Sequence, residues 1–93
     1  MYKYIRGETF NIEIDGRSLA IRRGMLVTIE KYIEHHQPTG GFLQAVLSNQ
    51  LKEAFGRADT DNLSNLEAFV AFLTWEAPSD CWGSVEKYQA WTT

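Results

Sequence analysis

The chain has few of the residues that disulfide-bonded, metal-binding and membrane proteins depend on. Its 93 residues include one cysteine, Cys81, so no disulfide forms within the chain, and a reducing compartment is indicated. Two adjacent histidines and one thiol do not supply the ligand spacing of a zinc site. No apolar run approaches the about 18 residues of a membrane span, and the first residues lack the apolar stretch of a signal peptide. We therefore expect a cytoplasmic protein without metal, cofactor or membrane contact.

The composition supports one folded domain. Apolar residues make up 44% of the chain and aromatic residues 13%, which is ample for a core. Charge is unevenly distributed, because residues 1–24 carry a net +2 and the remainder a net −5. Such a difference is typical of a solvated surface, with a basic binding edge as the alternative. We predict a single α+β domain over residues 1–93, with a β-hairpin region at 1–23 packed on a helical core at 24–93.

The N-terminal residues have the two-residue period of strands. Apolar and polar side chains alternate over 9–14, and Asp15-Gly16 then supplies a dipeptide that tolerates the positive φ angles of a hairpin turn. This pattern predicts a β-hairpin over about residues 8–22, with Tyr2 and Tyr4 adding a third strand. A hairpin edge that no helix covers would also offer a route to a homodimer by strand addition.

The rest of the chain has helical periodicity, with clear start and stop signals. Pro38 and Pro78 end helices, and Ser84 is an N-cap residue. Asp59, Asp61 and Asn62 can each accept from the first amides of the helix that follows them. Asn49 is a candidate to close a helix. About four helices are predicted, namely 25–36, 39–49, about 62–76 and 84–91, with a short turn at 51–55.

Three details of these helices are specific enough to check. We expect Gly24 to form the turn into the first helix, Thr39 to cap the second, and Gly56 to end the short turn in a left-handed conformation. The spacing also places apolar residues on two buried stripes. The first contains Phe42, Leu43, Val46, Leu47 and Leu51, and the second contains Leu63, Leu66, Phe69, Val70, Phe72 and Leu73.

Four motifs could carry chemistry, and each has a simpler structural interpretation. Neighbouring helix residues point about 100° apart, so His35-His36 cannot chelate one metal as residues four apart can. Cys81 would need a histidine base brought to it by the fold, and a packed thiol is the simpler interpretation. Gly40-Gly41 could bind an anion, but glycine also permits close approach of another segment. The spacing of Asp59 and Asp61 matches the first two ligands of a calcium-binding loop, but the ligands required further along such a loop are missing. Helix capping therefore explains these two acids better.

The ordered motifs of the helical part resemble those of a known family. They are Tyr32-Ile33-Glu34-His35, GGFLQAVLSN at 40–49, FGRAD at 55–59, Asn62-Leu63, Ala77-Pro78, CWGS at 81–84, and Trp91. Together they resemble a family of small proteins encoded by phages, prophages and related mobile elements, over about residues 28–91. The resemblance implies a phage or mobile-element origin, where small non-enzymatic accessory proteins are common. It supplies no catalytic or ligand residues, and the hairpin lies outside it.

The functional hypothesis is protein binding without catalysis. Aromatic and arginine side chains dominate protein interfaces, and both occur in the N-terminal region. The predicted contact residues are Tyr2, Tyr4, Arg6, Arg17, Arg22 and Arg23. In a phage setting the partner would be a host or defence protein complex, as for an anti-CRISPR-like inhibitor. Two alternatives remain open, a DNA-binding accessory protein that uses the basic hairpin and a self-assembling structural component of a phage.

Overall fold

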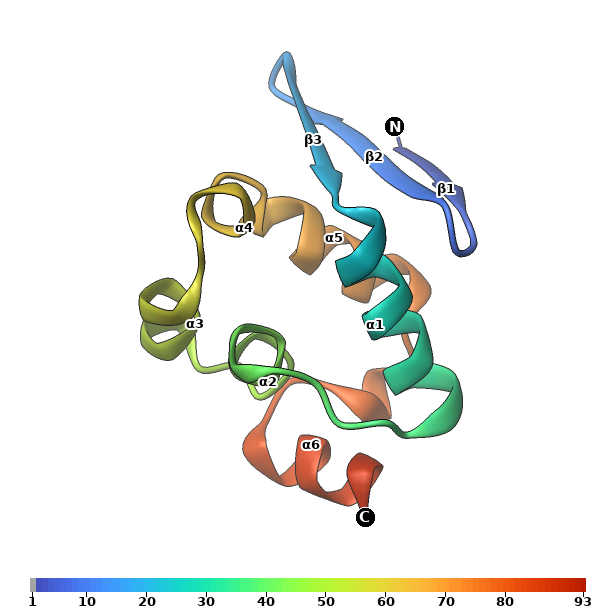
Figure 1. Cartoon of the computed structure of the whole chain (residues 1–93), viewed down its shortest axis with the longest axis vertical. Helices are drawn as coiled ribbons and strands as arrows, with labels where there is room; N and C mark the ends of the chain where they lie inside the picture. Colours follow the sequence, from blue (N-terminus) through green and yellow to red (C-terminus); the bar gives the residue numbers. More distant parts are fainter. Residues whose placement is uncertain (1) are drawn as a thin grey trace.

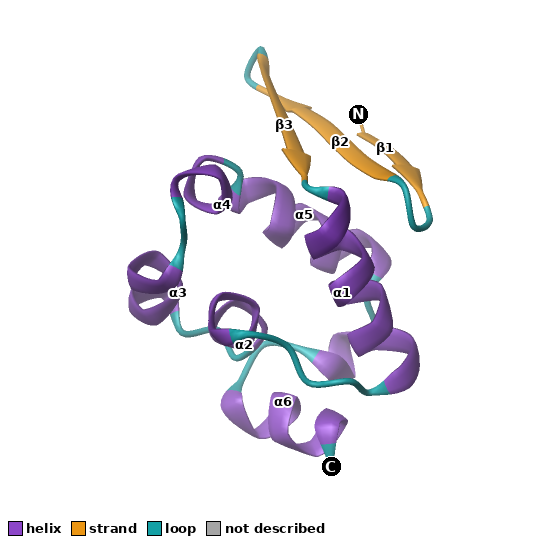
Figure 2. Cartoon of the chain, viewed as in Figure 1, coloured by secondary structure: helices purple, strands orange, loops and turns teal. Residues whose placement is uncertain are grey.

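A three-stranded antiparallel sheet is the first element of the fold, as the computed structural model shows for residues 2–93 (Figures 1 and 2). Its strands are β1 (Tyr2–Ile5), β2 (Thr9–Ile14) and β3 (Arg17–Ile21), in the order β1-β2-β3. Asp15 and Gly16, with φ of 50° and 75°, form the turn between β2 and β3. Both the hairpin and the third strand are thus confirmed, as is the α+β class.

Six α-helices and one short 3-10 helix follow the sheet. They are α1 (Arg23–His35), α2 (Gly41–Leu47), α3 (Leu51–Arg57), α4 (Thr60–Ser64), α5 (Leu66–Glu76), η1 (Ser79–Cys81) and α6 (Val85–Thr92). The sequence predicted about four helices. The number differs because the short turn after Asn49 is a full helix, α3, and because the long helix predicted over 62–76 is divided into α4 and α5.

Asn65 is the residue at which the predicted long helix breaks. The side-chain N–H of Asn65 donates to the backbone carbonyl of Asp61 at 2.8 Å, and the side-chain oxygen Oδ1 accepts from the backbone N–H of Ala20 at 2.9 Å. An asparagine that bonds to nearby backbone offers the chain an alternative to helix continuation. The second bond also occupies an outward-facing donor on β3, so Asn65 covers part of that sheet edge.

Three local predictions are wrong by one or a few residues. Gly24 lies inside the first turn of α1, and the extended backbone of Arg22 (ψ 144°) makes the turn instead. The N-cap of α2 is Gly40, not Thr39. The Thr39 hydroxyl donates to the carbonyl of Gly40 and does not cap the helix. Gly56 is helical, and α3 ends when Ala58 becomes extended, without a left-handed residue.

The inner face of the sheet packs on α1 and α5. Phe10 is fully buried at the centre of this contact, and its ring meets that of Phe72 edge-on at 5.2 Å between centroids. Tyr4 meets Phe72 in the same way at 5.0 Å. Edge-to-face aromatic pairs of this kind add about 0.5–1.5 kcal/mol to the burial itself. The sheet is therefore fixed on the helices by a cluster of rings.

The end of the chain is held against α1 by polar contacts of aromatic residues. The Tyr32 hydroxyl donates to the carbonyl of Cys81 at 2.6 Å, and the Trp91 indole donates to the carbonyl of Tyr32 at 2.7 Å. Ser84 caps α6, as predicted, by accepting from the amide of Lys87 at 3.1 Å. Figure 1 shows the N-terminus, in the sheet, and the C-terminus, after α6, toward opposite ends of the long axis.

Candidate protein-binding surface

All six residues that the sequence predicted for partner binding make contacts within the molecule. Arg22, at the junction of β3 and α1, forms ion pairs with Asp59 at 3.1 Å and Asp61 at 3.2 Å. Arg23 donates to the backbone carbonyl of Gly7 at 3.2 Å. The other four bond to helical carboxylates, in the pairs Tyr2 with Glu76, Tyr4 with Glu30, Arg6 with Glu34, and Arg17 with Glu67.

Glu30 is the most enclosed of these carboxylates. Only 6% of the residue is exposed, and its carboxylate accepts from the Tyr4 hydroxyl at 2.7 Å and the Gly7 amide at 2.8 Å. Burial, together with the bond to Glu30, raises the pKa of the Tyr4 phenol, so the hydroxyl keeps its proton and remains a donor. This carboxylate therefore fixes the turn between β1 and β2 on α1.

These pairs explain the uneven charge of the sequence. The cations and phenols lie on the N-terminal side and the carboxylates on the helices, so the two parts carry complementary groups that meet where they pack. The outer face of the sheet has little net charge, because Lys3 and Glu13 both line its hollow of about 520 Å³. Of the arginines that could have formed a basic DNA-binding edge, Arg6, Arg17 and Arg22 are paired with acids, and Arg23 bonds to a backbone carbonyl.

The candidate nucleophile and bases have very different exposures. Cys81 is fully buried, and burial raises the pKa of its thiol to about 11, which leaves little reactive thiolate near neutral pH. His35 and His36 lie exposed at the end of α1, and the ring of His36 packs on Trp91 at 4.2 Å between centroids. Within residues 2–93, no group of three or more His, Cys, Asp or Glu side chains is placed to hold a metal ion.

The glycine pair and the acidic pair have structural roles. An added Cβ at Gly41 would lie 2.7 Å from Nη1 of Arg57, so the close approach that glycine permits is that of this arginine, not of α1. Of the three candidates Asp59, Asp61 and Asn62, it is Asp59 that caps α4, accepting from the amide of Asn62 at 2.7 Å. That bond, with the nearby charge of Arg22, lowers the pKa of the Asp59 carboxyl.

An apolar surface that the sequence did not predict lies on α3. The chain reverses between α2 and α3 at Asn49, which has φ of 60°. The Asn49 amide donates to the carbonyl of Val46 at 3.1 Å, and the Gln50 amide donates to that of Ala45 at 2.8 Å. These two bonds are the Schellman motif, with asparagine in the position that glycine usually fills. The reversal sets the start and direction of α3.

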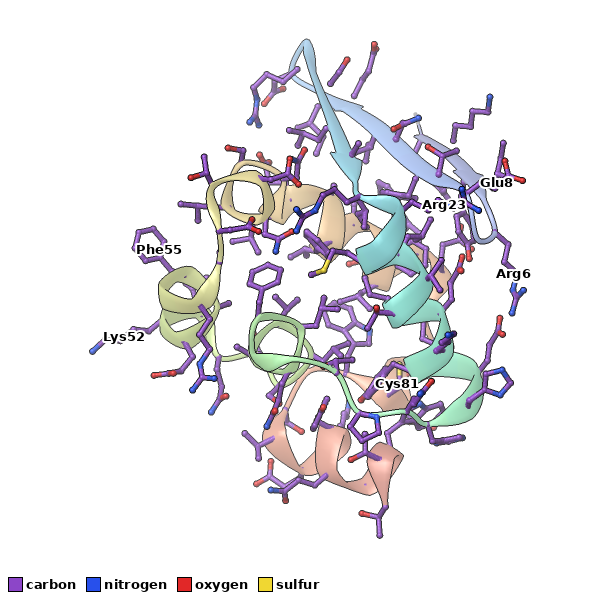
Figure 3. All side chains as sticks on the ribbon, in the orientation of Figure 1. Arg6, Glu8, Arg23, Lys52, Phe55 and Cys81 are labelled. Atoms are coloured by element: carbon purple, nitrogen blue, oxygen red, sulfur yellow. The ribbon has the colours of Figure 1, made fainter. Side chains whose placement is uncertain are left out.

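This direction leaves the large apolar side chains of α3 in solvent. Only Ala54 of α3 is buried, while Leu51 is 73% exposed and Phe55 64% exposed. Figure 3 shows Phe55 and Lys52 pointing away from the body of the molecule. The prediction that Leu51 continues the buried stripe of the preceding helix is wrong, because the stripe ends at the Asn49 reversal. Leu63 and Val70, also predicted for the core, are 39% and 45% exposed.

Two of these exposed side chains, Leu51 and Val70, line a groove. Its volume is about 120 Å³, and it lies between α2, α3 and α5. Its lining is mostly apolar and consists of Ala45, Val46, Asn49, Gln50, Leu51, Ala54, Leu66, Val70 and Trp82. A cavity of about 150 Å³ holds a benzene molecule, so this groove suits one large apolar side chain. We refer to Leu51, Phe55, Val70 and the groove together as the α3 face.

The sequence contained a signal for the α3 face. Leu51, Ala54, Phe55 and Ala58 follow the i, i+3, i+4, i+7 spacing of an amphipathic helix. The spacing identifies an apolar stripe but does not say whether the same chain covers it.

Comparisons with other proteins suggest no function for this chain, so a functional proposal has to rest on the geometry described above. No helix within residues 2–93 is long and apolar enough to cross a bilayer. No protein-family model matches the chain, and neither a curated protein nor a solved structure is significantly similar to it.

Proposed function

We propose that this protein is a small accessory protein that acts by binding another protein, without catalysis. The observation that carries this proposal is the α3 face, where Leu51 and Phe55 are more exposed than any other large apolar residue in the described chain and where Leu51 also lines an apolar groove. Contiguous exposed apolar patches on small proteins commonly mark interaction sites. The phage-like motifs suggest a host or defence protein complex as the partner, in the manner of an anti-CRISPR-like inhibitor.

The α3 face is a better candidate than the arginines and tyrosines of the sheet. Binding through Arg17 or Arg22 would require a partner to compete with Glu67, Asp59 and Asp61 for the same guanidinium groups. Leu51 and Phe55 have no such competing contacts to give up, and covering them removes apolar surface from water. Aromatic residues such as Phe55 are also enriched at the centres of protein interfaces.

Capture from a lysate of the natural host tests this proposal. Tagged wild-type protein should retain a partner protein after nuclease treatment, and Phe55→Asp should lose it while remaining folded. Ile5→Asp is the matched control, because Ile5 is also an exposed large apolar residue, at 39%, but lies on β1. Retention by Phe55→Asp and loss by a combined Arg6→Ala and Arg17→Ala variant would return the site to the sheet. Recovery of nucleic acid in place of protein would favour the DNA-binding alternative.

A further inference from the structure

Helix α3 is held in the fold by few contacts of its own. Of its seven residues only Ala54 is buried, and the large side chains of Leu51 and Phe55 lie in solvent. The equally long α2 is different, because five of its residues are buried, namely Phe42, Leu43, Ala45, Val46 and Leu47. Packing of an apolar face supplies most of the stability of a helix in a protein. That contribution is therefore small for α3.

The local sequence of α3 does not make up for its weak packing. Its seven residues are fewer than the about 12–15 that an isolated helix needs in water. Gly56 lies inside the helix, where glycine is among the least favourable residues. Among residues 2–93, no side chain caps the first turn at Gln50. The groove beside Leu51 and Ala54 also keeps this side of the helix from packing closely on α5.

The chain on either side of α3 is fixed more firmly. Leu47 before it is fully buried, and Asp59 after it caps α4 and pairs with Arg22 at 3.1 Å. Two non-helical residues separate α3 from these fixed points. They are Asn49, in the left-handed region with φ of 60°, and Ala58, in an extended conformation with ψ of 139°. Residues at the ends of elements are the usual hinges of a moving segment.

Opening of α3 costs the rest of the fold little. It exposes Ala54, breaks helical bonds such as that from the Ala54 amide to the Gln50 carbonyl at 2.9 Å, and separates Arg57 from Gly41. Because α3 lies at the surface, water can replace these polar partners. The released residues also regain backbone entropy. The aromatic cluster between the sheet and α5 contains no residue of α3, so it stays intact.

We infer that α3 opens and closes as a unit within the folded protein, hinged at Asn49 and Ala58, while the rest of the chain stays folded. The role of this motion rests on the proposed function, because Leu51 and Phe55 form one binding surface only while α3 is closed. Opening then withdraws the α3 face, and a bound partner holds α3 closed. Exchange of backbone amide hydrogens with solvent reports such local opening separately from global unfolding.

Hydrogen exchange measured residue by residue by NMR tests the inference. The amides of residues 54–57, which donate within α3, should exchange faster than those of Phe72 and Leu73 in α5. Ile29→Val removes a methyl group from a fully buried side chain of α1, and should speed exchange in α5 by roughly two- to ten-fold. It should leave exchange in α3 unchanged, because local opening does not depend on the stability of the whole fold. Exchange in α3 that rises in step with α5 overturns the inference.

A substitution within α3 should give the complementary result. Gly56→Ala should slow exchange in α3 by roughly two- to five-fold and leave α5 unchanged, because alanine favours the helix. The added Cβ meets no atom of the described chain within 4 Å. Gly24→Ala is the matched control, since its Cβ also enters open space but lies in α1. Equal slowing of α3 by both variants, or no slowing by Gly56→Ala, overturns the inference.

Capture of the partner distinguishes failure of this inference from failure of the proposed function. If Phe55→Asp still captures the partner, the proposed binding surface is wrong, whereas the exchange rates of the free protein still decide whether α3 opens. If Phe55→Asp loses the partner but α3 exchanges in step with α5, the binding surface stands and the local opening does not. In the complex, exchange in α3 should be slower than in the free protein.

Discussion

The sheet contacts the helices through aromatic rings and ion pairs, whereas α3 buries only one alanine. In both regions the residue type alone gives the wrong binding surface. Arg17 of β3 and Arg22 just after it are paired with acids of the helical part, whereas on α3 the apolar Leu51 and Phe55 are exposed to solvent. Residue type therefore does not identify a free binding surface. What identifies it is whether the fold supplies a partner for each side chain.

Truncating a ring in the sheet contact should have the largest effect on stability. Phe10→Ala removes a fully buried ring that packs on Phe72, and should lower the free energy of unfolding by about 3–5 kcal/mol. Phe55→Ala makes the same chemical change at an exposed site and should cost less than about 0.5 kcal/mol. Urea unfolding of both variants measures the difference. Equal losses would mean that the α3 face is buried in the free protein.

Removing the hydroxyl of Tyr4 should destabilise the fold more than removing that of Tyr2, because Tyr4 bonds to the buried Glu30 and Tyr2 to the exposed Glu76. Tyr4→Phe leaves the buried Glu30 carboxylate with the Gly7 amide alone, and should cost about 1.5–3 kcal/mol. Tyr2→Phe removes the bond to Glu76, which lies in solvent, and should leave the urea midpoint almost unchanged. A larger effect at Tyr2 than at Tyr4 would contradict the assignment of Glu30 as the anchor of the first turn.

Alkaline pH should weaken the fold through the buried phenols and the thiol. The pKa values of Tyr4 and Tyr32 are raised above 10.0, and that of Cys81 is raised from 9.0 to about 11, in each case mainly by burial. Above about pH 9 the unfolded chain loses these protons first, so it binds fewer protons than the folded chain and the free energy of unfolding falls. The contribution is intact below pH 9 and is lost as pH rises through 11 and beyond.

Urea midpoints at pH 7, 9, 10 and 11 measure this slope. Cys81→Ala and Tyr4→Phe should each make the decline shallower, whatever they do to stability at pH 7. An unchanged slope in both variants would show that these groups do not titrate differently in the folded and unfolded chains.

An exposed ion pair of the sheet should have the smallest effect. Arg6 and Glu34 pair with side-chain exposures of 63% and 36%, and such pairs contribute about 0–1 kcal/mol. Arg6→Glu should destabilise slightly, and the double variant with Glu34→Arg should recover most of the loss. A double-mutant cycle measured at low and high salt isolates the pair. A coupling that salt does not reduce would mean that the pair is more enclosed than its exposure indicates.

Sequence reasoning succeeded where a residue and its neighbours decide the structure. Asp15-Gly16 sets the hairpin turn, and Asp59 and Ser84 cap helices through bonds that span three residues. Pro78 follows the end of α5 because proline cannot continue a helix. These signals were sufficient for the strands, for most helix boundaries and for the α+β class.

The sequence could not show which distant side chains meet. Asn65, at the break in the predicted long helix, accepts a hydrogen bond from the amide of Ala20, 45 positions earlier. Arg17 and Tyr2 bond to acids that are 50 and 74 positions away, so the sequence could not show that their side chains have partners within the molecule. Leu51 and Phe55 were visible as an apolar stripe, but only the direction of the chain after Asn49 decides that nothing covers them.

The dependence of the sheet on α5 has a consequence for how the protein is made. Phe10 is synthesised 62 residues before Phe72, on which its ring packs in the finished protein. At about 5–20 residues per second, the ribosome needs roughly 3–12 s to supply that surface. Until then, α1 is the only one of the two helices under the sheet that has been made, so the inner face of the sheet lacks its contact with α5. The first part of the chain to be made is thus among the last to complete its packing.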